Sequence, residues 1–303
     1  MVVVGHDSKR GEAAAAQLGA NARHACADLS SVSSIDAMLR ALPPGPVQCV
    51  FANAAAQYTR ADEDKPRTDD GAVDRVLMTN FVGPFVVVQR LLPRLQHRDL
   101  RAAGRAVFTV GPQLDYATAP PSNLSATLSR ADRYAASKTA VYCAASEFAR
   151  RFPEIRVVLF VPPPVHTGFH PSWMTRDLFP GSLERVADAW AEVALGPPRR
   201  ASPVVWRVAP AHDASPPAVE IDLVKRSGAL CFANDVVVRQ DAQSDLFASV
   251  FSFAPDAADA GDHDSDAVHV THADSAGGDE GNSGSSGARK RASEGRGGYC
   301  VVA

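Results

Sequence analysis

Residues 134–161, YAASKTAVYCAASEFARRFPEIRVVLFV, contain the two patterns that decide the fold. The first belongs to an alanine-rich segment from Arg133 to Arg151, which predicts a long helix. The second, Arg156-Val-Val-Leu-Phe-Val161, is a continuous apolar run after its first residue, which suits a strand buried on both faces of a parallel sheet. The stretch therefore predicts one helix-and-strand unit of an α/β fold.

The same alternation extends to both sides of this stretch. Short β-branched runs alternate with longer helical patterns from Met1 to about Val208, as in repeated βα units. The predicted strands are Val2–Val4, Ala22–Ala25, Gln48–Ala52, Ala106–Val110, Arg156–Val161 and Val204–Val208. The predicted helices are Ser8–Leu18, Ser34–Leu42, Asp74–Leu95, Arg133–Arg151 and Leu183–Leu195. This order predicts a doubly wound parallel sheet between two helical layers.

Composition narrows the class of protein. The chain has 303 residues, 46% of them hydrophobic, which supplies a sizeable buried core. Its net charge of -3 argues against a nucleic-acid-binding protein. The five cysteines are widely spaced, no segment has the length of a membrane span and no signal peptide is recognisable, so we expect a cytoplasmic protein.

Composition changes after Phe253, where Asp, Gly, Ser and His replace the apolar periodicity. Such a segment buries too little apolar surface to offset its ordering entropy. We therefore predict one domain over 1–253 and a disordered tail over 254–303. Residues 221–253 allow two interpretations, a last strand and helix on the sheet or a loosely attached extension.

Tyr134 and Lys138 are the first candidates for chemistry. Side chains four residues apart share one helix face, so an ammonium can lie beside a phenol. A phenol titrates near pH ~10, and lowering its pKa by about three units requires about 4 kcal/mol of preferential stabilisation of the phenolate. A cation supplies much of this, although the same spacing is also common among surface pairs.

Four further motifs lie along the chain in a fixed order. They are Asp28-Leu-Ser30, Val50-Phe-Ala-Asn53-Ala-Ala55, Asn80-Phe-Val-Gly83-Pro-Phe85 and Pro162-Pro-Pro-Val165-His-Thr167. Each alone has a structural explanation, such as a helix cap or a rigid turn. In series with Tyr134-Ala-Ala-Ser-Lys138, they make the chain from Val2 to about Phe253 resemble the short-chain dehydrogenase/reductase family.

The resemblance implies an NAD(P)-dependent oxidoreductase that acts on an alcohol or carbonyl of a small hydrophobic molecule. By this resemblance Tyr134 is the general acid/base, while Lys138 lowers its pKa and holds the nicotinamide ribose. Asn80 completes the proton relay through a water molecule to Lys138. Members of the family often form homo-oligomers, and nothing in the sequence decides this for the chain.

The resemblance also implies a nucleotide site. Asp28 is expected to contact the adenine, Asn53 to lie at the cofactor, and Val165 and Thr167 to lie in the loop that holds the carboxamide. After the first predicted strand, His6, Lys9 and Arg10 place bases where an acid would select NAD. We therefore expect NADP rather than NAD.

The sequence departs from the family in its nucleotide-binding half. The family's first strand and glycine-rich turn are missing, because Val2–Val4 aligns with its second strand. The first strand is central, so either the chain is truncated, which we favour, or the sheet closes in an unusual way. Ala55 and Pro163 replace family glycines, which restricts the backbone near the cofactor.

The serine that orients the substrate carbonyl is also missing. The alignment places Gly111 at its position, which leaves Thr109, Ser122 or Ser125 as substitute donors. Losing one such donor costs about 3 kcal/mol of barrier. The alternative reading is therefore a catalytically impaired family member with a binding or membrane-associated role.

The last four residues match a lipidation motif. Cys300-Val-Val-Ala303 has the C-a-a-X pattern, Ala at the last position favours farnesyl, and Arg289-Lys-Arg291 lies upstream. The alternative is a chance match in a low-complexity tail. Since one lipid chain anchors only marginally, we expect at most reversible, peripheral membrane association through Cys300.

Overall fold

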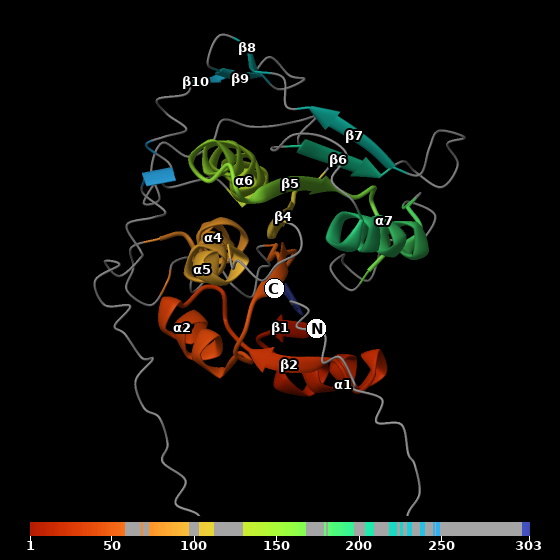
Figure 1. The fold of residues 1–303 in the computed structure, drawn as a ribbon. Helices are drawn as coiled ribbons and strands as arrows, with labels where there is room; N and C mark the ends of the chain where they lie inside the picture. Colours follow the sequence, from red (N-terminus) through yellow and green to blue (C-terminus); the bar gives the residue numbers. More distant parts are fainter. Residues whose placement is uncertain are drawn as a thin grey trace, which may run out of the picture. The chain divides into compact units, whose positions relative to one another are not determined.

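The centre of the fold is a twisted sheet of eight strands (Figure 1). Their order is β2-β1-β11-β3-β4-β5-β6-β7, and all neighbouring pairs are parallel except β6 and β7. The strands are β1 (Val2–Gly5), β2 (Arg23–Cys26), β3 (Val47–Ala52), β4 (Arg105–Thr109), β5 (Arg156–Val161), β6 (Val204–Val208), β7 (Ala218–Asp222) and β11 (Tyr299–Val302). The predicted α/β fold with a parallel sheet is confirmed, and each predicted strand is present with bounds that shift by at most one residue.

A computed structural model provides these coordinates. It describes residues 1–57, 68, 73–96, 103–111, 130–167, 179, 181–196, 204–208, 218–222, 225–226, 229–231, 237–239, 245, 247–248 and 299–303. These residues belong to one compact unit, Met1–Ala254 with Gly297–Ala303, and residues 255–296 form a second unit that lies outside the described part.

Strand β11 comes from the far end of the chain and pairs on both sides. Val301 and Val302 are register partners of Val2 and Val3 in β1 on one side, and of residues in β3 on the other. In Figure 1 it is the blue strand between β1 and β3. The structure therefore corrects the predicted domain boundary, because the last residues of the segment 254–303 belong to the sheet.

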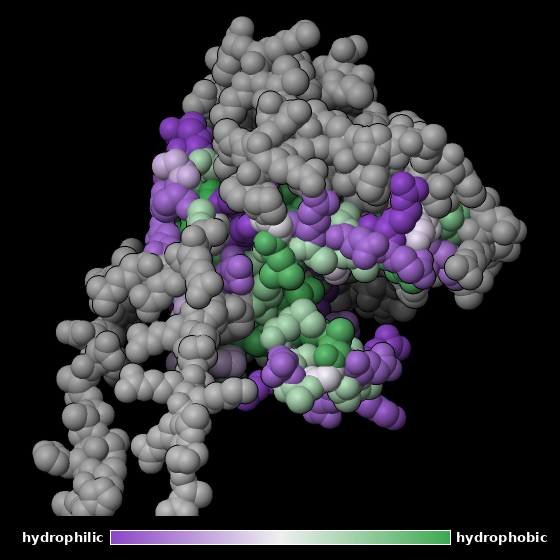
Figure 2. All heavy atoms as spheres, turned by 45° about the vertical axis from the view of Figure 1, so that its right-hand side comes forward, coloured by the Kyte–Doolittle hydropathy of each residue, from purple (hydrophilic) through white to green (hydrophobic). Residues whose placement is uncertain are grey.

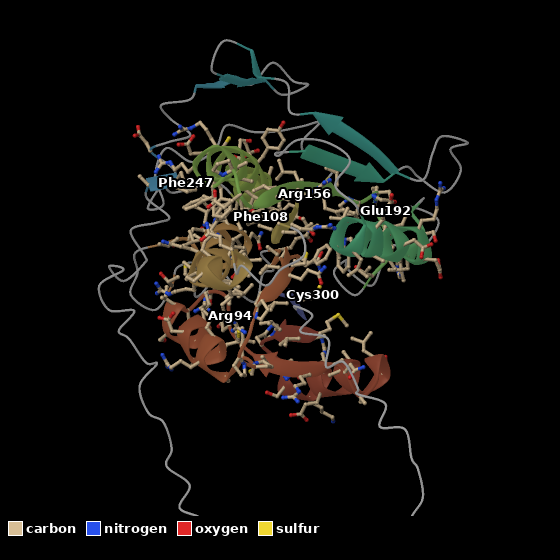
Figure 3. The ribbon with its side chains drawn as sticks, in the orientation of Figure 1. Arg94, Phe108, Arg156, Glu192, Phe247 and Cys300 are labelled. Atoms are coloured by element: carbon tan, nitrogen blue, oxygen red, sulfur yellow. The ribbon has the colours of Figure 1, made fainter. Side chains whose placement is uncertain are left out.

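Helices α2 (Val32–Ala41), α4 (Gly83–Arg90) and α6 (Arg130–Arg151) pack against one face of the sheet. Their apolar side chains form the main core, in which the rings of Phe85 and Phe108 stack with centroids 4.4 Å apart. Phe247 closes this core next to α6, where its ring lies 6.3 Å from that of Phe148 and beneath the Arg151 guanidinium (Figure 3).

The opposite face carries α1 (Ser8–Leu18) and α7 (Leu183–Leu195). Helix α1 packs against β1 and β2, and the Asp7 side chain caps it by accepting a bond from the Arg10 amide. Helix α7 packs against β3, β4 and β5 in a smaller apolar cluster that includes Phe51, Val107 and Phe160. Among the described residues, no helix has the combination of length and apolar character that a membrane crossing requires.

The predicted helix 74–95 is broken into four consecutive pieces. They are α3 (Arg75–Leu77), the π-helical turn η2 (Met78–Val82), α4 and α5 (Leu92–Leu95). Gly83 begins α4 with its backbone against Leu29, where a Cβ would have no room. A π turn widens the helix locally and is frequent at functional sites.

The region 221–253 matches neither interpretation of the sequence fully. Strand β7 begins earlier, at Ala218, and pairs antiparallel with β6. Strands β8 (Lys225–Arg226), β9 (Ala229–Cys231) and β10 (Val237–Arg239) form a separate antiparallel sheet. Strand β7 agrees with the interpretation of a last strand on the sheet, and Asp245, Phe247 and Ala248 are helical, whereas the small second sheet was not expected.

Candidate active site

The predicted site residues follow the carboxyl ends of parallel strands. His6 follows β1, Asn53 follows β3, Gly111 follows β4 and Val165 follows β5. Because the carboxyl ends of parallel strands meet at one edge of the sheet, these positions share that edge, where ligands bind in folds of this kind.

Lys138 is a buried lysine that links α6 to the end of β4. Its side chain is buried in α6, and its Nζ donates a hydrogen bond of 2.9 Å to the carbonyl oxygen of Thr109, at the end of β4. Burial lowers the pKa of Lys138 to about 8, because removing water disfavours the charged form. The helix and the strand end are thus joined by an ammonium whose remaining two hydrogens have no assigned acceptor within the described residues.

Tyr134 lies one helical turn before Lys138. The Lys138 Nζ is 5.7 Å from the centroid of the Tyr134 ring, so the predicted pair shares one side of α6. Burial raises the pKa of Tyr134 to about 12. Desolvation of the phenol is the cause of this rise, and the role of Lys138 in lowering the pKa stays a prediction.

Asn80 lies in the π turn η2 and ties three segments together. Its Oδ1 accepts from the Ala56 amide at 2.7 Å, and its Nδ2 donates to the Ala56 carbonyl at 3.0 Å and to Ser137 Oγ at 3.1 Å. Its hydrogen bonds reach the chain after β3 and the neighbour of Lys138 in α6, while the predicted route through water to Lys138 stays a prediction. Asn80 is a positioning residue in this structure.

Sequence reasoning missed Ser137 and the ion pair between Asp74 and Arg133. Ser137 is fully buried, and its Oγ accepts from Asn80 and donates to the Tyr134 carbonyl at 2.7 Å. Asp74 caps α3 and binds the Arg133 guanidinium at 3.0 Å, which fastens η2 and α6 together. The signal for Ser137 was its place inside the string 134–138.

The expected substitute for the missing serine is only partly described. Gly111 is buried at the predicted position after β4, and Ser122 and Ser125 lie outside the described residues. Thr109 Oγ1 is buried and has no hydrogen-bond partner within the described part of the chain. Of the three suggested donors, Thr109 is therefore the one whose place beside Lys138 is known.

The nucleotide-binding half is built differently. The amides of Asn53 and Ala54 donate to the carbonyl oxygen of Ala303 at 2.5 Å and 2.9 Å, and the Ala303 amide donates to Phe51 at 2.7 Å. The end of β11 thus engages the backbone after β3. The predicted Asn53 is at the correct edge of the sheet, and its amide already has an acceptor.

Among the described residues, Asp28 makes hydrogen bonds only to those close to it in sequence. Its Oδ1 accepts from the Ser30 amide at 2.8 Å and from Ser30 Oγ at 2.7 Å. Its own amide donates to Ser34 Oγ at 3.0 Å. These bonds form the turn that leads into α2, whose N-cap is Ser31. The residue remains exposed, so contact with an adenine stays a prediction.

The three predicted phosphate ligands are exposed at the start of α1. His6, Lys9 and Arg10 all lie at the surface. The Arg10 guanidinium is 3.3 Å from the Asp7 carboxylate, and its side chain is 89% exposed. An ion pair this exposed is weak, which leaves the arginine available for another anion.

Val165 and Thr167 lie in the loop after β5. The Gly181 amide donates to the Pro164 carbonyl at 2.9 Å, and the rings of His166 and Phe179 meet edge to face at 5.4 Å. The loop that contains both predicted residues is thus anchored by the segment before α7. Its contact with a carboxamide stays a prediction.

Comparison with known proteins assigns the family. A family model described as short chain dehydrogenase matches residues 1–177. The chain belongs to the short-chain dehydrogenase family. No protein of curated function matches the sequence.

Solved structures agree with the fold of this short-chain dehydrogenase. An uncharacterised protein from Mycobacterium paratuberculosis superposes with a TM-score of 0.58 at 18% identity, covering 83% of this chain and 82% of its own. A 3-ketoacyl-(acyl-carrier-protein) reductase from Brucella melitensis complexed with NADH gives 0.50 at 21%, with 64% and 79% covered. An alcohol dehydrogenase from Thermococcus sibiricus complexed with 5-hydroxy-NADP gives 0.50 at 16%, with 71% and 87% covered.

This short-chain dehydrogenase closes its sheet without the first strand of the family. Strand β11 lies between β1 and β3, which is the position that the sequence analysis found empty. Of the two explanations considered, the structure shows unusual closure of the sheet and gives no support to truncation.

The same strand bears on the predicted lipidation. Cys300 lies in β11 opposite Cys49, and Val301 and Ala303 are buried. A prenylated terminus must be accessible to a transferase and carry an exposed lipid, whereas this one is part of the sheet. The structure therefore gives no support to prenylation of Cys300.

Proposed function

We propose that this short-chain dehydrogenase is a nicotinamide-dependent oxidoreductase that reduces a carbonyl group of a small apolar molecule. The observation that carries the proposal is the buried Lys138, bonded to the Thr109 carbonyl beside Tyr134 and held by the Asn80–Ser137 bond. Burying the Lys138 ammonium beside the polar side chains of Tyr134, Asn80 and Ser137 costs stability, so such an arrangement is retained where it has a use. The complexes of related folds with NADH and with 5-hydroxy-NADP add support for the cofactor.

The residues fit one half of such a cofactor. Lys138 has two hydrogens left for the hydroxyls of a nicotinamide ribose, and Thr109 Oγ1 is a buried polar atom without a partner in the described chain. The diphosphate half fits less well, because Ala303 accepts the amides of Asn53 and Ala54. When bound, the nicotinamide supplies the hydride chemistry.

The protein's own residues handle the proton. With its pKa at about 12, Tyr134 is protonated at neutral pH and can donate its phenolic hydrogen to a substrate oxygen that gains negative charge. Lys138 stabilises the phenolate that remains and can return a proton to it. The protonated phenol is the form that donates a proton when a carbonyl is reduced, and reduction is the reaction we propose.

NADP is the cofactor we propose. His6, Lys9 and Arg10 are exposed at the start of α1, next to the end of β1. A 2′-phosphate at this point would meet the positive charges of Lys9 and Arg10, while the nearby Asp7 carboxylate is already paired with Arg10 at 3.3 Å.

The test is steady-state oxidation of NADPH with a panel of aldehydes and ketones. Tyr134→Phe removes the proton donor and is expected to lower kcat/KM at least about 100-fold. Tyr142→Phe is the matched control, because Tyr142 lies in the same helix, is 9% exposed and is not at the site. Full activity in the Tyr134→Phe variant would remove this residue from the mechanism.

A second candidate function is binding of a partner without catalysis. The observation in its favour is that Ala303 occupies the backbone amides at the nucleotide edge. Calorimetric titration with NADPH and NADP separates the two proposals. Binding in the micromolar range contradicts the second proposal, and no heat at millimolar nucleotide contradicts the first.

A further inference from the structure

Cys49 and Cys300 are direct register partners on neighbouring strands. Cys49 lies in β3 and Cys300 in β11, and their side chains join the same apolar cluster on the side of the sheet that α7 covers. Neighbouring strands lie about 4.8 Å apart. Disulfides form between Cα atoms about 4.4–6.8 Å apart, a range that includes the spacing of register partners on neighbouring strands.

The two thiols interact with each other and with a cation. A hydrogen bond from Cys49, with the Arg105 guanidinium as a further cause, lowers the pKa of Cys300 to about 7, while burial raises the pKa of Cys49. Arg105 lies at the start of β4, where Cys49 is its register partner. Cys300 is therefore the thiol that ionises first, and the thiolate is the reactive form.

Solvent reaches only one of the two thiols. Cys49 is fully buried, and Cys300 is only partly buried. Figure 2 is turned so that the side with α7 comes forward, and it shows apolar side chains at the surface between hydrophilic ones. Figure 3 labels Cys300 between β1 and α7. A small reagent can thus reach Cys300 first, and Cys49 only through it.

The other described cysteines have no such partner. Cys26 is exposed on β2, where its Sγ donates to the His6 carbonyl, and Cys143 is buried in α6. Within the described residues, only Cys49 and Cys300 are both adjacent and differently ionised. The arrangement has an attacking thiol and a resolving thiol.

We propose that Cys49 and Cys300 form a reversible disulfide that fastens β11 to β3. Oxidised glutathione, or another small disulfide, is the oxidant. The Cys300 thiolate attacks one sulfur of the oxidant, which forms a mixed disulfide and releases one glutathione thiolate. Cys49 then loses its proton and attacks the Cys300 sulfur, releasing the second glutathione. Two protein thiols are oxidised, and one small disulfide is reduced to two thiols.

The bond would act on the strand that completes the sheet. It closes a loop of about 250 residues, and long loops restrict the unfolded chain most. Reduction leaves β11 held by backbone hydrogen bonds and apolar contacts alone. The oxidation state of the pair therefore sets how firmly the end of β11 stays at Asn53 and Ala54.

The experiment uses the full chain with Cys26→Ser, Cys143→Ala and Cys231→Ser, which leaves only the proposed pair. The protein is equilibrated with oxidised and reduced glutathione, blocked with an alkylating reagent and digested with trypsin without reduction. We expect a linked peptide pair, 41–60 with 297–303, that is lost after reduction. Two alkylated thiols at every glutathione ratio, or links only between separate molecules, would overturn the proposal.

Two further variants keep the test decisive. Cys49→Ser removes the resolving thiol and should trap glutathione on Cys300, whereas Cys300→Val, an apolar substitution for a strand, should leave Cys49 unmodified. Glutathione on Cys49 instead would contradict the proposed order. Thermal melts of the unmutated chain should show a Tm several degrees higher after oxidation than after reduction. None of these measurements uses a nucleotide, so their outcome is independent of the proposed oxidoreductase activity.

Discussion

The two halves of the carboxyl edge of the sheet differ in how they are held. Around β4 and α6, buried side chains make the bonds: Lys138 donates to the Thr109 carbonyl, and Asn80 donates to Ser137 Oγ. Around β1 and β11, the edge is formed by backbone, with Ala303 accepting the amides of Asn53 and Ala54. The first half contains specific chemistry, and the second contains the structural replacement of a strand.

This difference teaches that proton transfer and nucleotide binding are separable in this fold. The buried network depends on side chains of η2 and α6 and on the Thr109 carbonyl of β4, and β3 lies between β4 and β11 in the sheet. The nucleotide half depends on what lies between β1 and β3. Changes in β11 should therefore affect stability first, whereas changes in the network should affect both stability and chemistry.

The largest effect is expected from removing Tyr299–Ala303. Without β11, the facing edges of β1 and β3 lose their hydrogen-bonding partner and the core beneath them is uncovered. We expect loss of the cooperative transition in a thermal melt followed by circular dichroism. Adding a peptide of residues 297–303 should restore the transition, while a scrambled peptide should not; an unchanged melt would show that β11 is dispensable.

A smaller loss of stability should follow from shortening one buried side chain of β11. Val301 is fully buried, so Val301→Ala should lower the free energy of unfolding by about 3 kcal/mol. Val302 is partly exposed on the other face and provides the matched control, with a loss of less than half that amount. Denaturant titration measures both, and equal losses would contradict the placement of the strand.

Asn80→Ala tests the network in the other half. It removes three hydrogen bonds, which takes the partner from the Ala56 amide and carbonyl and the donor from Ser137 Oγ, so we expect a loss of about 2 kcal/mol in stability together with lower activity. Ser146→Ala is the control, since its hydroxyl bonds only within α6. A stable and fully active Asn80→Ala variant would show that the network is not needed.

The pH dependence of activity sharpens the same comparison. Burial lowers the pKa of Lys138 to about 8, so the ammonium is lost as the pH rises through that value, and kcat/KM should fall about tenfold for each further pH unit. The unfolded chain keeps this proton to a higher pH, so stability should rise over the same range. Lys138→Arg should move the fall in activity upward. A flat profile to pH 10 would exclude an essential ammonium.

The smallest effect concerns the exposed bases of the nucleotide half. Arg10→Gln should raise the KM for NADPH about threefold and leave that for NADH unchanged, because an exposed charge contributes little. Arg40→Gln, an exposed arginine at the end of α2, is the control. Equal changes for both cofactors would remove Arg10 from a phosphate site.

Periodicity and composition were sufficient for the parallel sheet up to Val208. The strands there are short and apolar, and their neighbours in the sequence fix their order through right-handed crossovers. The pairing of β11 could not be read in this way, because a strand of four residues after a polar segment has no local signal. Its pairing is determined by the facing edges of β1 and β3, which have room for one strand between them.

The site was predictable where one helix carries it. Tyr134 and Lys138 lie on a common side of α6 because their spacing is one helical turn. The pKa of Tyr134 was not predictable, since burial depends on the packing of elements distant in sequence. The roles of Asp74 and Ser137 depend on a break in the helix 75–95 that helical periodicity does not reveal.

The position of β11 also determines when this protein can fold. During synthesis its residues leave the ribosome only after all the other strands of the sheet, so the nascent polypeptide carries two unpaired inner edges until then. Such edges invite association with other chains, and pairing across nearly the whole sequence slows folding. Production of this protein should therefore depend on chaperones that shield the incomplete sheet until β11 has been synthesised.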